Sequence, residues 1–178
     1  MQNHRNRGNT VNTCIVAAEA KDLGRIAQLY FQNHTSVYRG LLPDAYISGL
    51  TLYDCRAKWD AFLGCPENRI WAAYRGEEFL GFAACMPDPK LPRTWYLESL
   101  HVTESARGRG VGSALIRTAG EYAVRNGYEK MSVCIVRGND RAGNLYARLG
   151  AEHYEYFEDS FMGSPSNSEK LIWNRIPH

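Results

Sequence analysis

The sequence predicts an α/β protein with one mixed, mostly antiparallel sheet and helices on both faces of that sheet. Two observations lead to this fold class. Three strand-like segments in the middle of the chain follow one another across a turn and a proline-rich loop, which is typical of antiparallel neighbours. After them the pattern changes to strand, helix, strand, a crossover that places two strands parallel in one sheet. Both kinds of neighbour in one chain indicate a mixed sheet.

The first part of the chain is expected to supply one strand and a broken helical region. Residues 13–18 form a short apolar run typical of a buried strand, and apolar residues recur at helical spacing from Lys21 to Asn33. Pro43 lies at a predicted helix start, and Gly64 ends the helical pattern that follows. Helices therefore separate the first strand from the strand-rich middle.

The later elements are predicted in a simple order, with Asn139 as the N-cap of the last helix. The predicted strands are residues 68–74, 79–86, 94–102, 130–136, 152–159 and 169–176, and the predicted helices are residues 110–126 and 139–149. The polar stretch GSPSNS, residues 163–168, is expected to be a loop.

The length of 178 residues is that of one ordinary domain, and we expect residues 11–178 to form it behind a disordered tail at residues 1–10. The tail is polar and basic, and no stretch approaches the roughly 20 apolar residues of a membrane helix. We therefore expect a cytoplasmic protein without a membrane partner. The net charge of +2 is too small to indicate a nucleic-acid partner.

The five cysteines and five histidines are dispersed along the chain. The nearest cysteines, Cys55 and Cys65, are too far apart for a C-x-x-C motif, and no histidine pair has ligand spacing. An odd number of cysteines in apolar surroundings favours reduced thiols that pack as small core side chains. We therefore predict no bound metal.

The stretch ARGRGVGSAL, residues 106–115, places glycines and arginines between a strand-like run and a helical pattern. Such a turn binds phosphate when glycines let unpaired N–H groups at a helix N-terminus approach one anion. The spacing excludes a P-loop, because Ser113 and not lysine follows Gly112. It also fails the pattern G-x-G-x-x-G, because the third glycine lies one residue too early. What remains is a loop in which Arg107 and Arg109 add charge suited to a pyrophosphate, or a turn that merely joins strand to helix.

Residues 107–112 resemble the R/Q-x-x-G-x-G/A motif of the GNAT superfamily of acetyl-CoA-dependent N-acetyltransferases. A second stretch, NDRAGNLYARLGA, is similar to the family pattern N-x-x-A-x-x-x-Y-x-x-x-G. The matching positions are Asn139, Ala142, Tyr146 and Gly150. Ala151 departs from the aromatic residue that usually follows this glycine. The order of elements also agrees, so the resemblance covers nearly the whole chain.

The resemblance implies the GNAT fold, in which two parallel strands splay apart and the pantetheine arm of acetyl-CoA, the expected co-substrate, fills the gap. The counterparts of these strands are residues 94–102 and 130–137. Backbone groups at residues 100–102 would bond the pantetheine and polarise the thioester, and N–H groups at residues 109–113 would hold the pyrophosphate. The implied cofactor-binding residues are Leu100, His101, Val102, Arg107, Gly108, Arg109, Gly110, Val111, Gly112, Ser113, Asn139 and Tyr146.

Transfer to an amine requires a base for the ammonium and gains from an acid for the thiolate. Glu98 is the candidate base, because a carboxylate in a mostly apolar strand is costly unless it is used or paired; the alternative is a structural ion pair with a nearby Arg or Lys. His101 is the second candidate base, and strand alternation predicts that its side chain points away from Glu98. Tyr146 matches the family's tyrosine and is the candidate acid, although a core aromatic would fit the same helix position.

The predicted reaction is direct transfer of an acetyl group to the primary amine of a small molecule. Two alternatives remain open: a non-catalytic acyl-CoA-binding sensor module, and transfer to a protein N-terminus or lysine. Aromatic residues that could surround the acceptor, most of them equally suited to the core, are Tyr38, Tyr46, Trp59, Tyr96, Tyr154 and Tyr156.

The last strand is expected to be exposed, where it could pair with a second copy in a homodimer.

Overall fold

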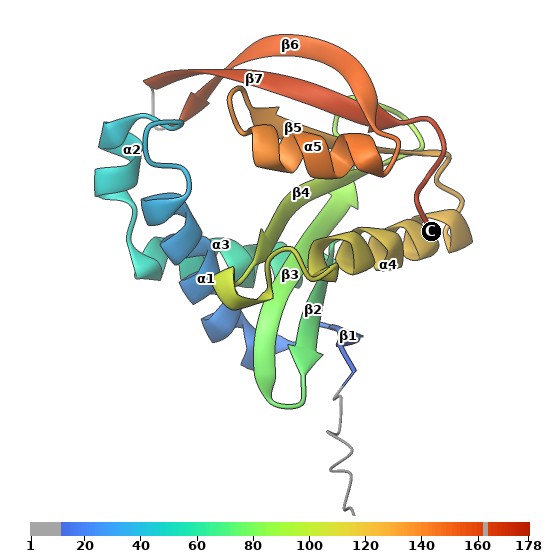
Figure 1. Ribbon diagram of the computed structural model, residues 1–178, viewed down its shortest axis with the longest axis horizontal. Coiled ribbons are helices and arrows are strands. Elements are labelled where there is room, and N and C mark those ends of the chain that lie inside the picture. Colours follow the sequence, from blue (N-terminus) through green and yellow to red (C-terminus); the bar gives the residue numbers. More distant parts are fainter. Residues whose placement is uncertain (1–11, 162–163) are drawn as a thin grey trace, which may run out of the picture.

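The computed structural model describes residues 12–161 and 164–178 and has the predicted fold class (Figure 1). A seven-stranded mixed sheet forms its centre, with helices on both faces. The tail expected at residues 1–10 lies outside the described residues. Within the described part of the chain, no helix is long and apolar enough to cross a membrane.

The helices and strands follow the predicted order, with shifts of a few residues at their ends. The strands are β1 Cys14–Ala17, β2 Arg69–Arg75, β3 Glu78–Pro87, β4 Thr94–Val102, β5 Lys130–Val136, β6 Glu152–Phe161 and β7 Ser164–Trp173. The helices are α1 Leu23–Ser36, α2 Asp44–Gly49, α3 Leu52–Gly64, α4 Val111–Arg125 and α5 Asp140–Arg148, with short 3-10 turns at Ala20–Asp22 (η1) and Glu104–Ala106 (η2).

The strand order in the sheet is β1-β2-β3-β4-β5-β7-β6. β4 and β5 are parallel, and the other neighbouring pairs are antiparallel. The parallel pairing joins residues 94–97 to residues 130–133, although both strands continue for several residues beyond them. β4 and β5 therefore separate halfway along, which is the predicted splayed pair.

Two expectations about the C-terminal strands are wrong. Ser164–Ser168, expected in a loop, begin β7 and pair with β6. β7 also lies between β5 and β6, so the last strand is not an exposed edge through which a second copy could pair. Pairing with β6 satisfies the backbone of residues 164–168, and this stabilises as a strand a segment whose polar composition resembles a loop.

The two faces of the sheet bury two separate hydrophobic clusters. On one face, α4 and α5 cover a cluster that includes Trp95 and Leu115. On the other face, α1 and α3 cover a cluster that includes Trp59 and Phe82. Figure 1 shows these helix groups on opposite sides of β4. Side chains of β4 therefore reach either core, depending on which face they point to.

Candidate active site

The glycine-rich loop joins β4 to α4 and ends in the first turn of that helix. Gly108 and Gly110 have φ of +73° and +82°, and Gly110 is the N-cap of α4. A side chain in this left-handed region costs about 1–2 kcal/mol, so glycine is favoured at both positions. The first helical hydrogen bond runs from the Ala114 N–H to the Gly110 carbonyl. The three preceding N–H groups of α4 therefore lie outside the helical ladder, where they can bind an anion.

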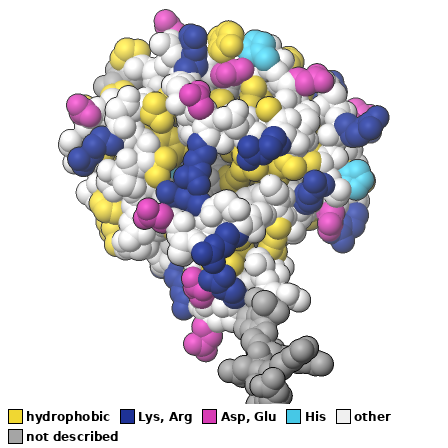
Figure 2. Space-filling view, in the orientation of Figure 1, with side chains coloured by type: hydrophobic (Ala, Val, Ile, Leu, Met, Phe, Trp, Pro, Cys, Tyr) yellow, Lys and Arg dark blue, Asp and Glu magenta, His cyan; other side chains and the backbone are white. Residues whose placement is uncertain are grey.

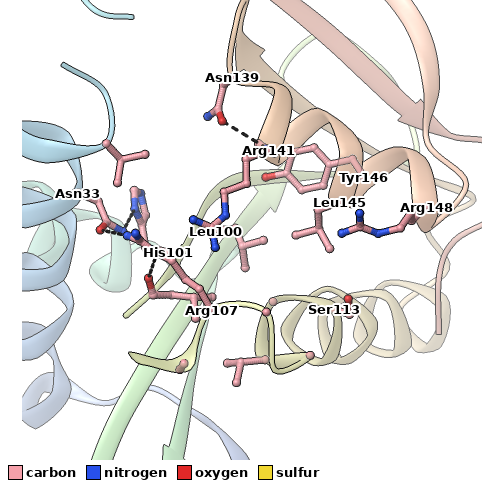
Figure 3. Close-up of a pocket in the computed structure, with 18 of the residues that line it drawn as sticks. Asn33, Leu100, His101, Arg107, Ser113, Asn139, Arg141, Leu145, Tyr146 and Arg148 are labelled. Carbon is pink, nitrogen blue, oxygen red and sulfur yellow. Dashed lines mark hydrogen bonds between the residues drawn. The ribbon is translucent and has the colours of Figure 1, made fainter. Parts of the chain in front are cut away.

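A cavity of about 450 Å³ lies against this loop, and we call it the glycine-loop cavity (Figure 3). Its lining brings together eleven of the predicted cofactor residues: Leu100, His101, Val102, Arg107, Gly108, Gly110, Val111, Gly112, Ser113, Asn139 and Tyr146. The twelfth, Arg109, is exposed and does not line the cavity. Residues far apart in the sequence therefore meet around the N-terminus of α4.

Two arginines that the sequence reasoning missed complete the glycine-loop cavity. Arg141 and Arg148 come from α5, with Leu145 between them, and all three side chains point toward the glycine loop in Figure 3. Their spacing of four and three residues places them on one helix face, which is the signal that could have found them. Figure 2 shows Lys and Arg side chains near the middle of this face of the molecule, with hydrophobic side chains between them. Positive charge thus faces the N-terminus of α4.

Arg107 lines the same cavity but is also anchored to α1. Its Nη2 donates to Asn33 Oδ1 at 2.7 Å, and its Nε donates to the Val102 carbonyl at 3.2 Å. Burial and the neighbouring Arg141 lower the pKa of Arg107. The side chain that was expected to serve only a pyrophosphate therefore also holds α1 against the glycine loop.

β4 contains a β-bulge at Glu98. Leu97 and Ser99 pair with consecutive residues of β3, which leaves Glu98 as the extra residue. One extra residue reverses the alternation of side chains beyond it. Glu98 and His101 therefore face the same side of the sheet, toward α1 and α3, and the expectation that they point to opposite sides is wrong.

Glu98 has a counter-ion on α3. Lys58 Nζ donates to Glu98 Oε1 at 2.6 Å, and Ser99 Oγ donates to Glu98 Oε2 at 2.5 Å. Lys58 also donates to the Tyr30 hydroxyl at 3.4 Å, and its ammonium lies 4.9 Å from the centre of the Tyr30 ring. The ion pair that the sequence left open as an alternative is therefore present. The side chain of Glu98 is still 22% exposed, so its carboxylate can be reached from solvent.

Glu98 and Lys58 line a second cavity of about 220 Å³, which we call the bulge cavity. Of the predicted acceptor aromatics, Tyr38 and Tyr96 line it. Trp59 is fully buried in the core beneath α3, and Tyr154 and Tyr156 are exposed on β6. The remaining polar side chains that line this cavity are Tyr30, His34, Ser99, His101, Cys134, Asn139, Tyr146, Asp159 and Ser168.

Two histidines lie side by side in the wall of the bulge cavity. The ring centres of His34 and His101 are 5.5 Å apart. Burial lowers the pKa of His34 to about 4 and lowers the pKa of His101 well below its usual value. Both imidazoles are therefore neutral near pH 7. The sequence reasoning missed His34, because a histidine on an amphipathic helix looks the same whether it lines a cavity or fills the core.

Tyr146 belongs to the wall that the two cavities share. Its ring is 5% exposed and lies edge-on to Trp173, with 5.6 Å between ring centres. Burial raises the pKa of the Tyr146 phenol, which therefore keeps its proton at neutral pH. The other residues that line both cavities are Tyr38, Leu100, His101, Asn139 and Ala142. Asn139 caps α5 as predicted, by accepting from the Ala142 N–H at 3.3 Å.

Across residues 12–161 and 164–178, no three His, Cys, Asp or Glu side chains lie close enough together to hold a metal ion.

A sheet that opens between two parallel strands, beside a helix N-terminus ringed by glycines and arginines, is suited to a phosphate-bearing molecule. The family model described as Acetyltransferase (GNAT) family matches residues 14–151. The chain therefore belongs to the GNAT acetyltransferase family, as the two sequence motifs predicted.

Individual relatives agree with this family. The uncharacterized N-acetyltransferase YhfO of Bacillus subtilis is 30% identical over 152 residues, which cover 84% of this chain and 96% of that protein. Thialysine N-epsilon-acetyltransferase of Bos taurus is 37% identical over 60 residues, which cover 34% of this chain and only 35% of that protein. The structure of YncA from Salmonella typhimurium with its cofactor acetyl-CoA has a TM-score of 0.68 at 18% identity, covers 90% of this chain and 92% of YncA, and shares the fold.

Proposed function

We propose that the protein transfers an acetyl group from acetyl-CoA to the primary amine of a small molecule. The observation that carries this proposal is the wall shared by the two cavities. The glycine-loop cavity offers N–H groups and arginines to a pyrophosphate, and the bulge cavity offers the Glu98 carboxylate to an amine. Tyr146 lies between them. The name of the Bos taurus relative, which specifies an N-epsilon nitrogen of thialysine, supports a small amine as the acceptor.

The residues present fit acetyl-CoA. The N–H groups of residues 111–113 and the arginines Arg107, Arg141 and Arg148 would hold its phosphates. The separation of β4 from β5 leaves backbone groups near Leu100 without a β5 partner, and the pantetheine arm would bond there. When bound, acetyl-CoA supplies an activated acetyl thioester.

Glu98 of the bulge cavity and Tyr146 of the shared wall account for the proton movements of the transfer. The amine nitrogen forms the new bond to the acetyl carbon while the carbon–sulfur bond breaks. Glu98 accepts the proton that the ammonium loses before it attacks, and Tyr146 gives a proton to the departing sulfur. Burial raises the pKa of the Tyr146 phenol, so the phenol is protonated at neutral pH and has a proton to give. Solvent later restores the proton of Tyr146 and takes that of Glu98.

A comparison of Glu98→Gln with Lys58→Met tests whether Glu98 is a base or only half of an ion pair. Each substitution removes one charge of the same 2.6 Å ion pair, so a purely structural pair predicts similar losses of stability and activity. If Glu98 is the base, Glu98→Gln lowers kcat by about 10²- to 10⁴-fold, while Lys58→Met keeps most of the rate at a similar melting temperature. Equal losses in both variants would remove Glu98 from the reaction.

The whole proposal is tested first by the binding of acetyl-CoA and then by the transfer of its acetyl group. Thermal-shift measurements with acetyl-CoA, coenzyme A, ATP and NADH should show stabilisation by the first two only. Thiol-release assays over a panel of small amines should then identify acceptors. If acetyl-CoA gives no stabilisation, the proposal fails. Stabilisation without thiol release on small amines, followed by release on peptides, would instead support a protein acceptor, and no release at all would support a sensor.

A further inference from the structure

A short hydrogen-bonded chain crosses from the glycine-loop cavity to the bulge cavity. Arg107 Nη2 lies 2.7 Å from Asn33 Oδ1, and Asn33 Nδ2 lies 3.0 Å from His101 Nδ1 (Figure 3). Asn33 and His101 are both buried, with 7% and 4% of their surfaces exposed. The chain thus links a residue of the glycine loop to a residue that lines both cavities.

The donors and acceptors in this chain can be assigned without seeing hydrogens. A guanidinium only donates, so the atom of Asn33 that faces Arg107 is its oxygen. The Asn33 amide nitrogen therefore faces His101 and donates to Nδ1. A neutral imidazole that accepts at Nδ1 carries its proton on Nε2. Since burial keeps His101 neutral, its Nε2 is an N–H donor.

His34, in the same cavity wall, has the opposite tautomer. Its Nδ1 lies 2.9 Å from the Tyr30 carbonyl oxygen, which can only accept. His34 therefore carries its proton on Nδ1 and presents a lone pair at Nε2. The two neighbouring histidines have opposite tautomers, and each is fixed by one partner on α1.

The aromatic neighbours of His101 place its ring beside the bulge cavity. Its ring centre lies 5.2 Å from that of Tyr30 and 5.5 Å from that of His34, and both residues line the bulge cavity, whereas Nδ1 faces Asn33 of the glycine-loop cavity. Among the described residues no hydrogen bond occupies Nε2. Lys58, a second donor, lies in the lining of the same cavity. Besides an amine, the bulge cavity is therefore suited to an oxygen atom that accepts hydrogen bonds.

We propose that Asn33 is a positioning residue that holds His101 as its Nε2–H tautomer, and that His101 donates through Nε2 to an oxygen of the acceptor amine. The acceptor class is thus an amine with a hydroxyl, carbonyl or carboxylate oxygen near its nitrogen. This tautomer cannot accept a proton at Nε2, so His101 is not the base. The acceptor class rests on the proposed function, whereas the tautomer does not.

The tautomer is tested by NMR on protein labelled with ¹⁵N-histidine, in which an N–H nitrogen and a lone-pair nitrogen have widely separated shifts. The wild type should show Nε2–H at His101 and Nδ1–H at His34, with the His101 signals assigned from their loss in His101→Gln. Asn33→Asp keeps the bond from Arg107 but offers His101 only an acceptor, so His101 should move its proton to Nδ1 or become charged. The His34 signals should not change. An Nδ1–H tautomer at His101 in the wild type, or unchanged His101 signals in Asn33→Asp, would overturn the proposal.

The acceptor class is tested with matched amines, such as 2-aminoethanol against propylamine, which exchange a hydroxyl for a methyl group. The wild type should prefer the oxygen-bearing amine in kcat/KM, and His101→Leu should reduce that preference about tenfold. His101→Gln, whose amide N–H can replace Nε2–H, should keep part of it. An unchanged preference in folded His101→Leu, or no preference in the wild type, would contradict the assigned class. Absence of transfer to every amine would instead count against the proposed function, and the NMR result would still decide the role of Asn33.

Discussion

The two cavities present different chemical groups to a ligand. The glycine-loop cavity is lined by the backbone N–H groups of one helix turn and by the long side chains of Arg141 and Arg148. The bulge cavity is lined by buried aromatic and imidazole side chains around the Lys58–Glu98 pair. Any chain that folds the same turn presents the same backbone N–H donors. Buried side chains differ between chains, and they select a ligand by its shape and by the tautomer of each imidazole. The first cavity therefore suits a ligand common to a whole family, and the second suits an acceptor particular to this protein.

The largest expected effect concerns the wall between the cavities. Tyr146→Phe removes the proton donor but keeps the ring against Trp173, so the fold should be unaffected. We expect kcat to fall by about 10²- to 10⁴-fold, the usual contribution of an acid catalyst, with little change in acetyl-CoA affinity. Single-turnover measurements give the rate and calorimetry gives the affinity. An unchanged chemical rate would make Tyr146 a wall residue only.

The next effect concerns His34 in the wall of the bulge cavity, and it is a loss of folding stability in acid. Burial lowers the pKa of His34 from 6.5 to about 4, so the unfolded chain binds a proton that the folded protein excludes between these values. The free energy of unfolding should therefore decrease as the pH falls from 6.5 to 4, by about 3 kcal/mol from this group. Urea unfolding at several pH values measures this decrease in the free energy of unfolding.

A variant separates His34 from other titrating groups. His34→Gln should remove the part of the decrease below pH 6.5 that burial of His34 causes. A pH profile of the His34→Gln variant that follows the wild type would show that the acid sensitivity arises elsewhere.

A smaller effect belongs to the glycine-loop cavity. Gly110→Ala forces a side chain into φ of +82°, at a cost of about 1–2 kcal/mol, and disturbs the N–H groups of α4. Gly127→Ala, with φ of +80° just after α4, imposes a similar strain far from the cavity. Both variants should lose similar stability in urea unfolding, but Gly110→Ala alone should lose acetyl-CoA affinity. Equal affinities would show that the loop does not hold the co-substrate.

The smallest effect concerns the charge at the rim of that cavity. Arg148→Gln should weaken acetyl-CoA binding by about fivefold at low salt, since an exposed ionic contact contributes at most about 1 kcal/mol. The difference from the wild type should shrink as the salt concentration rises. Arg125→Gln, on the exposed face of α4 beside Glu121, serves as the control and should leave affinity unchanged. Calorimetry at two salt concentrations measures both variants.

Local sequence features made one half of the site predictable. The glycines of the loop and the Asn139 cap act within a few residues of their own positions, so their spacing in the sequence carries over to the structure. Arg141 and Arg148 were equally readable, because they share one helix face with Leu145. The bulge at Glu98 was not readable, since a bulge depends on the register between β3 and β4. Simple alternation of side chains along a strand without a bulge therefore placed His101 on the wrong face of the sheet.

The sequence by itself determined the family, the order of elements and the position of the glycine loop at the start of α4, because each depends on short-range spacing. The tertiary structure alone decided that Lys58 of α3 pairs with Glu98 and that Asn33 of α1 sets the tautomer of His101. Both contacts join side chains that are distant in the chain and meet only when the helices pack on the sheet. The ion pair and the tautomer each depend on which atoms meet there, and spacing along the chain does not specify that.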